Sequence, residues 1–211
     1  MSTAVPIPLN RERLAAAVHS LAAIDQDLAR ISAINGVPPM WARRQGYATL
    51  VQIILEQQVS LASADAMYRR LKTQVTPLTP KKILQAGVPF LQSLGITRQK
   101  SQYFINVAEA IRSKDLNLGE LVFCDDKTAI DKLTGIKGIG PWTAQVYLLN
   151  ALLRPDVWPA GDIALATAVK HLKKLEVRPK PDEMVDLAEI WSPNRATAAR
   201  MLWQYYLSVE L

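Results

Sequence analysis

The most informative stretch of the chain is Leu133–Ala144, Leu-Thr-Gly-Ile-Lys-Gly-Ile-Gly-Pro-Trp-Thr-Ala. Its closely spaced glycines predict a tight turn, because glycine adopts positive φ and lets another chain come close. Pro141 suits the first position of a new helix, where its missing N–H group has no partner to lose. The stretch therefore predicts a helix, a turn and a second helix. Free N–H groups at that second helix, with Lys137 beside them, favour binding of a nucleic-acid phosphate.

A second informative segment is Asp156–Leu165, in which a loop containing proline and glycine leads to an aspartate that opens a helix. A helix over Trp142–Leu152 rises roughly 16 Å. The segment Leu153–Gly161 can then return at most about 30 Å. We therefore expect Asp162 to lie beside the glycine turn, on the side that faces DNA. Taken alone, Asp162 would be interpreted as an ordinary helix N-cap.

Together the two segments resemble the helix-hairpin-helix DNA glycosylases, and most of all their 3-methyladenine DNA glycosylase II branch. The pattern Leu-x-Gly-Ile-x-Gly-Ile-Gly-x-Trp-Thr-Ala, followed by the loop and the aspartate, carries the resemblance over roughly residues 45–207. The hairpin alone also occurs in many non-catalytic DNA-binding proteins. The hairpin with an aspartate at this distance is far more specific.

The resemblance makes Asp162 the catalytic residue. An N-alkylated purine is already a positively charged leaving group, so a carboxylate that stabilises the oxocarbenium ion and orients water is sufficient. Lyase-type relatives have a Schiff-base lysine where this chain has Trp142. We expect Trp142 to form a wall of the base pocket and to stack on a cationic base, although it could simply be a core residue. Val146 and Asn194 stand where the family often has aromatic residues, and Tyr47 is expected to help close the pocket.

The loop Glu56–Ser60 resembles the family's Gln-x-Val-Ser loop, one residue of which enters the duplex where the target base leaves. Gln58 is the predicted wedge, with Gln57 and Ser60 as neighbouring DNA contacts. The alternative is a polar loop in which Ser60 only caps the next helix. The resemblance also predicts DNA contacts along the hairpin, at Gly135, Lys137, Gly138, Ile139, Gly140 and Thr143.

The resemblance implies one bound ion and no other cofactor. The backbone carbonyls of Thr134, Ile136 and Ile139 would hold a Na⁺ or K⁺ ion that also touches phosphate. Some relatives, such as endonuclease III, bind an iron–sulfur cluster through four clustered cysteines. This chain has the single cysteine Cys124, so we expect no cluster.

Composition favours a nucleic-acid partner in the cytoplasm. The net charge of +6 suits a polyanion. No apolar run reaches the ~18 residues of a membrane span, and residues 1–9 lack the pattern of a secretory signal. We expect a cytoplasmic, nucleoid-associated monomer without a membrane partner, which binds double-stranded DNA containing an alkylated base.

Helical periodicity runs along the chain, and no segment alternates as a strand does. The prediction is an all-α fold of about ten helices without an N-terminal α/β domain. Lobe one covers about 40–145, including the hairpin 133–144, and lobe two covers about 10–35 with 146–211. The expected caps are Asn10, Ser60, Thr97 and Asp126. The expected helices are about 10–34, 47–57, 61–71, 80–86, 88–94, 98–112, 128–133, 142–152, 163–174, 182–190 and 194–208.

The resemblance implies a monofunctional DNA glycosylase that flips and excises N-alkylated purines, of the 3-methyladenine and 7-methylguanine type, in base excision repair. Two alternatives stay open. One is a glycosylase for another base lesion on the same scaffold, and the other is a non-catalytic helix-hairpin-helix module that only binds DNA. The catalytic role of Asp162 separates the module from both enzymes.

Overall fold

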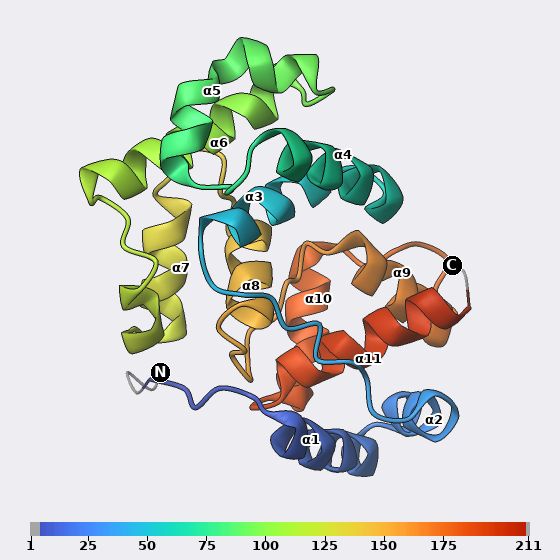
Figure 1. The fold of residues 1–211 in the computed structure, drawn as a ribbon. Coiled ribbons are helices and arrows are strands. Elements are labelled where there is room, and N and C mark those ends of the chain that lie inside the picture. Colours follow the sequence, from blue (N-terminus) through green and yellow to red (C-terminus); the bar gives the residue numbers. More distant parts are fainter. Residues whose placement is uncertain (1–4, 210–211) are drawn as a thin grey trace. The chain divides into compact units, whose positions relative to one another are not determined.

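The computed structural model describes residues 5–209, which form helices and loops without a strand (Figure 1). The predicted all-α class is confirmed. No helix among these residues has both the length and the apolar character needed to cross a lipid bilayer. The elements are α1 (Arg11–Ile24), α2 (Gln26–Asn35), α3 (Tyr47–Glu56), α4 (Leu61–Gln74), α5 (Pro80–Ser93), α6 (Arg98–Ser113), the 3-10 helix η1 (Glu120–Phe123), α7 (Asp126–Thr134), α8 (Pro141–Asn150), α9 (Ile163–Leu172), α10 (Pro181–Ala188), the 3-10 helix η2 (Glu189–Trp191) and α11 (Arg195–Ser208).

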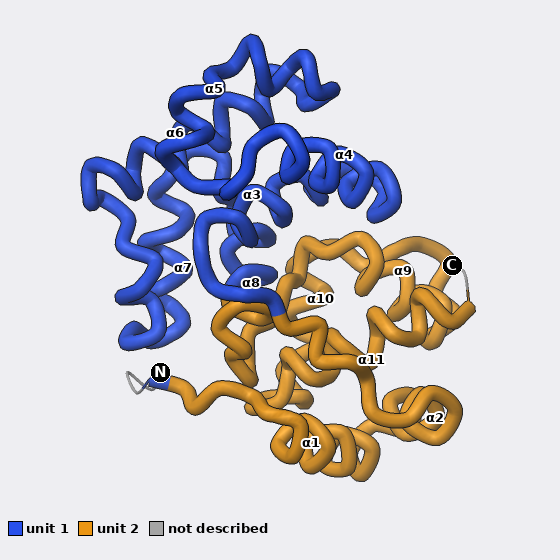
Figure 2. Tube along the Cα trace, in the orientation of Figure 1, with its two compact units in different colours: residues 1–5, 43–147 blue, residues 6–42, 148–211 orange. Residues whose placement is uncertain are grey.

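The helices form two compact units, which Figure 2 colours separately. Among the described residues, unit 1 contains Val5 and Arg43–Tyr147. Unit 2 contains Pro6–Ala42 and Leu148–Leu211. Helix α8 begins in unit 1, and its last residues belong to unit 2.

Short polar side chains determine where several helices begin. The side chains of Asn10, Ser60 and Thr97 each accept a hydrogen bond from the backbone N–H group three residues further on, as predicted. Such caps each stabilise a helix by about 1 kcal/mol. The prediction for α7 is wrong by one residue, because its cap is Asp125 and not Asp126. The carboxylate at position 125 accepts the N–H bond, so the helix begins earlier.

The single helix predicted from Asn10 to Ile34 is in fact two helices. The break lies at Asp25, whose backbone is extended (φ −133°, ψ 114°). The Asp25 carboxylate accepts bonds from two N–H groups of the first turn of α2, and its other oxygen accepts the indole N–H of Trp191 at 2.9 Å. Apolar residues continue at helical spacing across the break, so their periodicity does not reveal it.

Helix α3 forms the centre of unit 1 and is buried on nearly all sides. Leu50, Val51, Ile53, Ile54 and Leu55 have no exposed surface. Burying one such side chain contributes about 1.5–3 kcal/mol. Helix α3 packs against α4 and α6, which fixes the position of the loop that follows its last turn.

Helix α11 is the centre of unit 2 and packs against α1, α2 and α9. Its Arg200 side chain is fully buried. The guanidinium donates hydrogen bonds to the carbonyls of Met40, Leu149 and Ala196, at 2.7–3.1 Å. Burial lowers the pKa of Arg200 to about 10. Arg200 therefore fixes two separate backbone segments, at Met40 and Leu149, against its own helix.

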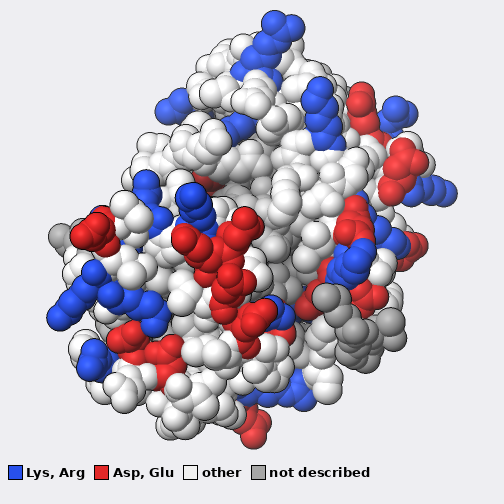
Figure 3. All heavy atoms as spheres, turned by 180° about the vertical axis from the view of Figure 1, so that it is seen from behind, with Lys and Arg blue, Asp and Glu red and all other residues white. Residues whose placement is uncertain are grey.

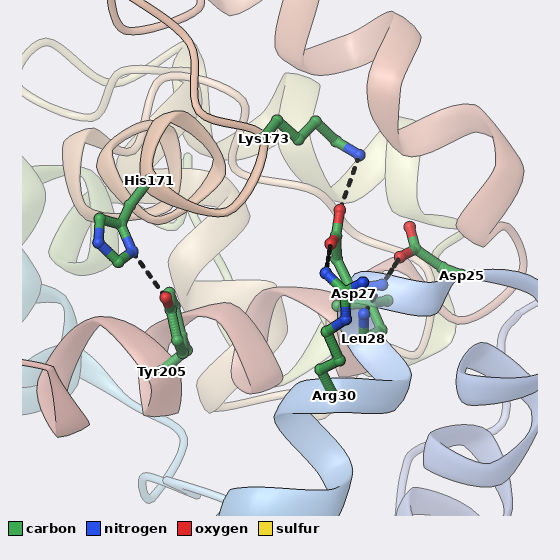
Figure 4. Close-up of polar contacts among 7 residues, drawn as sticks. All are labelled: Asp25, Asp27, Leu28, Arg30, His171, Lys173 and Tyr205. Carbon is green, nitrogen blue, oxygen red and sulfur yellow. Dashed lines mark hydrogen bonds and ion pairs between the residues drawn. The ribbon is translucent and has the colours of Figure 1, made fainter.

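Polar contacts at the edge of unit 2 join α2 and α11 to the last turn of α9 (Figure 4). Lys173, which caps α9, points to the Asp27 carboxylate of α2, with Nζ 3.3 Å from Oδ2. The Nδ1 atom of His171 lies 2.6 Å from the Tyr205 hydroxyl on α11. Exposed contacts of this kind contribute at most about 1 kcal/mol each, so the buried residues carry most of the stability.

Candidate functional site

The glycine turn predicted from the sequence joins α7 to α8, and one of its glycines has a clear steric cause. Gly138 has a φ of +111°. A Cβ atom on Gly138 would lie 2.3 Å from Cγ of Tyr103. The turn therefore passes directly over the Tyr103 ring, and only glycine fits there.

Helix α6 packs against the turn and fixes its backbone. Tyr103 and Asn106 are three residues apart and lie on one face of α6. The Asn106 side chain donates a hydrogen bond from Nδ2 to the carbonyl of Lys137 at 3.0 Å. The Lys137 side chain itself is exposed. One helix face thus fixes the backbone of the turn and leaves its basic side chain in solvent.

The same face of α6 also fixes the end of α3 through Lys100. The ammonium group donates to the carbonyls of Leu55 and Gln57, both at 2.8 Å. These carbonyls belong to the end of a helix, where acceptors lack partners and a positive charge is stabilised. Burial lowers the pKa of Lys100. The Lys100 side chain therefore orients the loop that follows α3.

Gln57 joins that loop to the glycine turn. Its Nε2 donates hydrogen bonds to the carbonyl of Gly138 at 3.1 Å and to the hydroxyl of Thr143 at 2.9 Å. Thr143 is only 1% exposed. Both residues are predicted DNA contacts, yet their side chains bind each other inside unit 1. Their observed role is to connect two predicted DNA-binding segments.

Gln58 projects from this fixed loop. It is exposed and has a φ of +54°, a left-handed conformation that costs a non-glycine residue about 1–2 kcal/mol. Val59 and Leu61 beside it are 40% and 60% exposed. Ser60 caps α4. The loop and the first residue of α4 therefore present polar and apolar side chains to solvent side by side.

The predicted base-pocket residues belong to both units. Trp142, in the first turn of α8, is half-buried, and Val146 one turn later is buried. Tyr47 is buried, and its hydroxyl donates to the carbonyl of Phe104 at 3.0 Å. Burial raises the pKa of Tyr47. Those three lie in unit 1, whereas Asn194 is a partly exposed residue of unit 2.

Asp162 opens α9 in unit 2. Its Oδ1 accepts the N–H group of Leu165 at 2.9 Å and the indole N–H of Trp203 at 3.2 Å. The residue is 7% exposed. The bond to Leu165 is the N-cap that the sequence predicts. Trp203 is not among the site residues predicted from the sequence. An indole N–H that is shielded from solvent usually needs an acceptor, and that rule could have identified it.

Asn194 is fixed by an ion pair at the start of α11. The Asp156 carboxylate accepts bonds from Nε and Nη2 of Arg195 at 2.9 and 2.7 Å. It also accepts the hydroxyl of Ser192 at 2.9 Å. A bidentate ion pair of this kind is stronger and more directional than a single hydrogen bond. The loop and the helix start around Asn194 are therefore held in one geometry.

Charge is unevenly distributed on the face drawn in Figure 3. One extended group of Asp and Glu side chains lies near the middle of that face, and smaller groups of both charges lie around it. In unit 2, helix α10 exposes Asp182, Glu183 and Asp186. The net positive charge of the chain is therefore not spread evenly over its surface.

Comparison with known proteins links these features to one family. A family model described as "HhH-GPD superfamily base excision DNA repair protein" matches residues 51–193. A protein of Bacillus subtilis, described as a candidate DNA-3-methyladenine glycosylase, is 31% identical over 166 residues. That match covers 75% of this chain and 58% of the Bacillus protein. The resemblance inferred from the sequence is confirmed.

Solved structures share the whole fold. The 3-methyladenine DNA glycosylase of Schizosaccharomyces pombe, in complex with abasic DNA, is 27% identical with a TM-score of 0.84. The superposition covers 90% of this chain and 95% of that one. A DNA-3-methyladenine glycosidase of Bacillus halodurans is 28% identical with a TM-score of 0.77, covering 92% and 90% of the two chains.

Proposed function

Because the chain belongs to the HhH-GPD superfamily of base excision DNA repair proteins, in its 3-methyladenine DNA glycosylase branch, we propose that it is a monofunctional glycosylase that excises N-alkylated purines from duplex DNA. The observation that carries the proposal is the buried carboxylate of Asp162, held by two donors at the start of α9. The N-cap bond alone would suit a purely structural aspartate, and family membership favours a catalytic role in addition.

The proposed reaction breaks the bond between C1′ of the sugar and N9 of the alkylated purine. The base carries a positive charge before cleavage, so it leaves as a neutral molecule and takes the bonding electron pair. Positive charge then develops on the sugar, where the Asp162 carboxylate stabilises it. The carboxylate also orients the attacking water and accepts its proton. The product is an abasic site in an intact strand.

The base must leave the duplex before this reaction. We assign the wedge to Gln58, which is exposed on a loop fixed by Gln57 and Lys100. The Gln58 amide can hydrogen-bond the unpaired base, and Val59 and Leu61 add apolar contact to the stack. Trp142 supplies an aromatic face for the cationic base.

The glycine turn and the N-terminus of α8 are the proposed phosphate contacts. The N–H groups of Gly135, Ile136 and Ile139 donate to carbonyls of α7 and the turn itself. We therefore assign phosphate binding to Gly138 and Gly140, with Lys137 beside them. Acidic surface of the kind seen on α10 repels DNA, which favours the turn over that surface.

A Na⁺ or K⁺ ion at the carbonyls of Thr134, Ile136 and Ile139 belongs to the same proposal. The Ile136 carbonyl accepts the N–H group of Ile139 at 3.0 Å. A carbonyl has two lone pairs, so this bond is compatible with a cation at the second one. Replacing K⁺ by tetramethylammonium at constant ionic strength should then weaken DNA binding, and unchanged affinity would refute the ion site.

The decisive test is base release from defined duplexes. One set contains 3-methyladenine or 7-methylguanine, and a second set contains uncharged lesions such as uracil and 8-oxoguanine. Free methylated purine, released by the wild-type protein and not by Asp162→Asn, supports the proposal. Release from the second set alone indicates a glycosylase for another lesion, and binding without release from either set indicates the non-catalytic module.

A further inference from the structure

The Asp162 carboxylate receives two donors on the same oxygen, from two different helices. The N–H group of Leu165 belongs to α9, and the indole N–H of Trp203 belongs to α11. We propose that Trp203 is a positioning residue, which fixes the rotation of the Asp162 carboxylate during base excision. This inference rests on the proposed function of Asp162.

The helix cap alone does not fix the carboxylate. The N–H bond from Leu165 constrains the position of Oδ1 from one direction. A second donor from another direction narrows the allowed orientations of the carboxylate, because hydrogen bonds weaken steeply away from linear geometry. The indole N–H of Trp203 provides this donor at 3.2 Å, to a side chain that is only 7% exposed.

The Trp203 ring is itself fixed by Trp41. The two ring centroids are 6.2 Å apart and the planes meet at 75°, an edge-to-face contact. Trp41 has a φ of +44°, which is rare for a bulky residue and persists only where the surroundings demand it.

Arg200 explains why the Trp41 segment stays in place. It lies three residues before Trp203, on the same helix, and its Nε donates to the carbonyl of Met40 at 3.1 Å. Met40 precedes Trp41 in the chain. The buried guanidinium of Arg200 thus fixes the segment that contains Trp41. Trp41 packs against Trp203, and Trp203 donates to the Asp162 carboxylate. This chain of contacts lies wholly within unit 2.

A purely structural role for Trp203 makes a different prediction. A buried tryptophan of the core contributes to stability, and its loss then lowers activity only by unfolding the protein. A positioning role lowers the rate of the chemical step while stability and DNA affinity are retained. Trp158 provides the matched control, because its indole N–H also donates to an internal acceptor, the Met184 carbonyl, at 2.9 Å. Its ring also contacts another tryptophan, Trp191.

The experiment replaces Trp203 with β-(3-benzothienyl)alanine, which keeps the ring shape and removes only the N–H donor. We expect the single-turnover rate on methylated duplex to fall roughly tenfold or more. The dissociation constant for a duplex with an uncleavable abasic analogue should stay within about twofold. The same replacement at Trp158 should leave the rate unchanged. Equal rates for wild type and the Trp203 variant would overturn the proposal, as would equal losses of rate and affinity.

A spectroscopic readout separates this proposal from the proposed function. In protein labelled with ¹⁵N at tryptophan, Asp162→Ala should move the Trp203 indole resonance upfield and speed its hydrogen exchange, while the Trp158 resonance stays in place. An unmoved Trp203 resonance refutes the contact, whatever the activity. If the Trp203 resonance moves in Asp162→Ala but the wild-type protein releases no methylated base, the contact is supported and the glycosylase is refuted.

Discussion

The side-chain amide of Gln57 donates hydrogen bonds to both the carbonyl of Gly138 and the hydroxyl of Thr143, at 3.1 and 2.9 Å. The loop after α3 and the glycine turn are therefore one connected element within unit 1. Lys100 adds a second connection, because its ammonium group binds the Gln57 carbonyl. We expect the two proposed DNA contacts, Gln58 and the turn, to depend on each other.

Gln57 and its neighbour Gln58 should respond differently to alanine substitution. Gln57→Ala removes two partly buried hydrogen bonds and should lower the free energy of unfolding by about 1–3 kcal/mol, with weaker DNA binding. Gln58→Ala removes an exposed side chain and should change stability by at most about 0.5 kcal/mol, while slowing base release. Urea unfolding and single-turnover assays measure both. Equal stability loss in the two variants would show that the Gln57 contacts are unimportant.

Gly138→Ala should disrupt the turn. The added Cβ atom meets the Tyr103 ring at 2.3 Å, and the backbone has positive φ. We expect a loss of about 2 kcal/mol or more in the free energy of unfolding, together with reduced DNA affinity. Gly140→Ala is the control, because a Cβ there has no neighbour within 4 Å. Similar stability of the two variants would contradict the observed packing of the turn on α6.

Alkaline pH should destabilise the protein through its buried tyrosines. Burial raises the pKa of Tyr147 from 10.0 to about 12. The raised pKa means that the folded state favours the neutral phenol. The raised pKa of Tyr147 stabilises the folded state by up to about 3 kcal/mol. This stabilisation is fully present below pH 10 and is lost as the pH rises towards 12.

Tyr147→Phe isolates this effect. Lys100 and Arg200, whose pKa values burial lowers, act in the opposite direction as the pH rises. Both proteins contain Lys100 and Arg200, so the contributions of these two residues cancel in the difference in unfolding free energy between wild type and Tyr147→Phe. That difference should be constant below pH 10 and should shrink between pH 10 and 12. A difference that does not vary with pH would show that Tyr147 ionises freely.

No strand cleavage should follow base release. A lyase needs a neutral lysine that reaches the sugar, and the resemblance to the family implies that Trp142 takes the place of that lysine here. Lys100 is the lysine whose pKa burial lowers, but its amine binds the carbonyls of Leu55 and Gln57. We expect borohydride to trap no covalent protein–DNA adduct above background. A trapped adduct that disappears in Lys100→Met would instead identify a Schiff-base lysine.

The sequence predicts the parts of the site that depend on local pattern. The glycine turn, the cap at Asp162 and the all-helical class follow from spacing and from residue types that favour particular backbone conformations. These features involve residues within a few positions of each other. Short-range rules are therefore enough to place them.

The missed features depend on partners far along the chain. The break at Asp25 is fixed partly by Trp191, 166 positions away. The contact of Trp203 with Asp162 spans 41 positions, and that of Lys100 with Gln57 spans 43. Residue type shows that the Trp203 N–H group needs an acceptor but not which acceptor it finds. Only the packed structure supplies that information.

The central claim is that the negative charge of Asp162 drives base release. Asp162→Asn keeps the size of the side chain and an oxygen that can accept the Leu165 N–H bond, so the protein should fold and bind DNA normally. Single-turnover release of 3-methyladenine from a defined duplex should fall by a factor on the order of 10²–10³ or more, with the DNA dissociation constant within about twofold of wild type. Release at the wild-type rate by a folded Asp162→Asn protein would contradict the account.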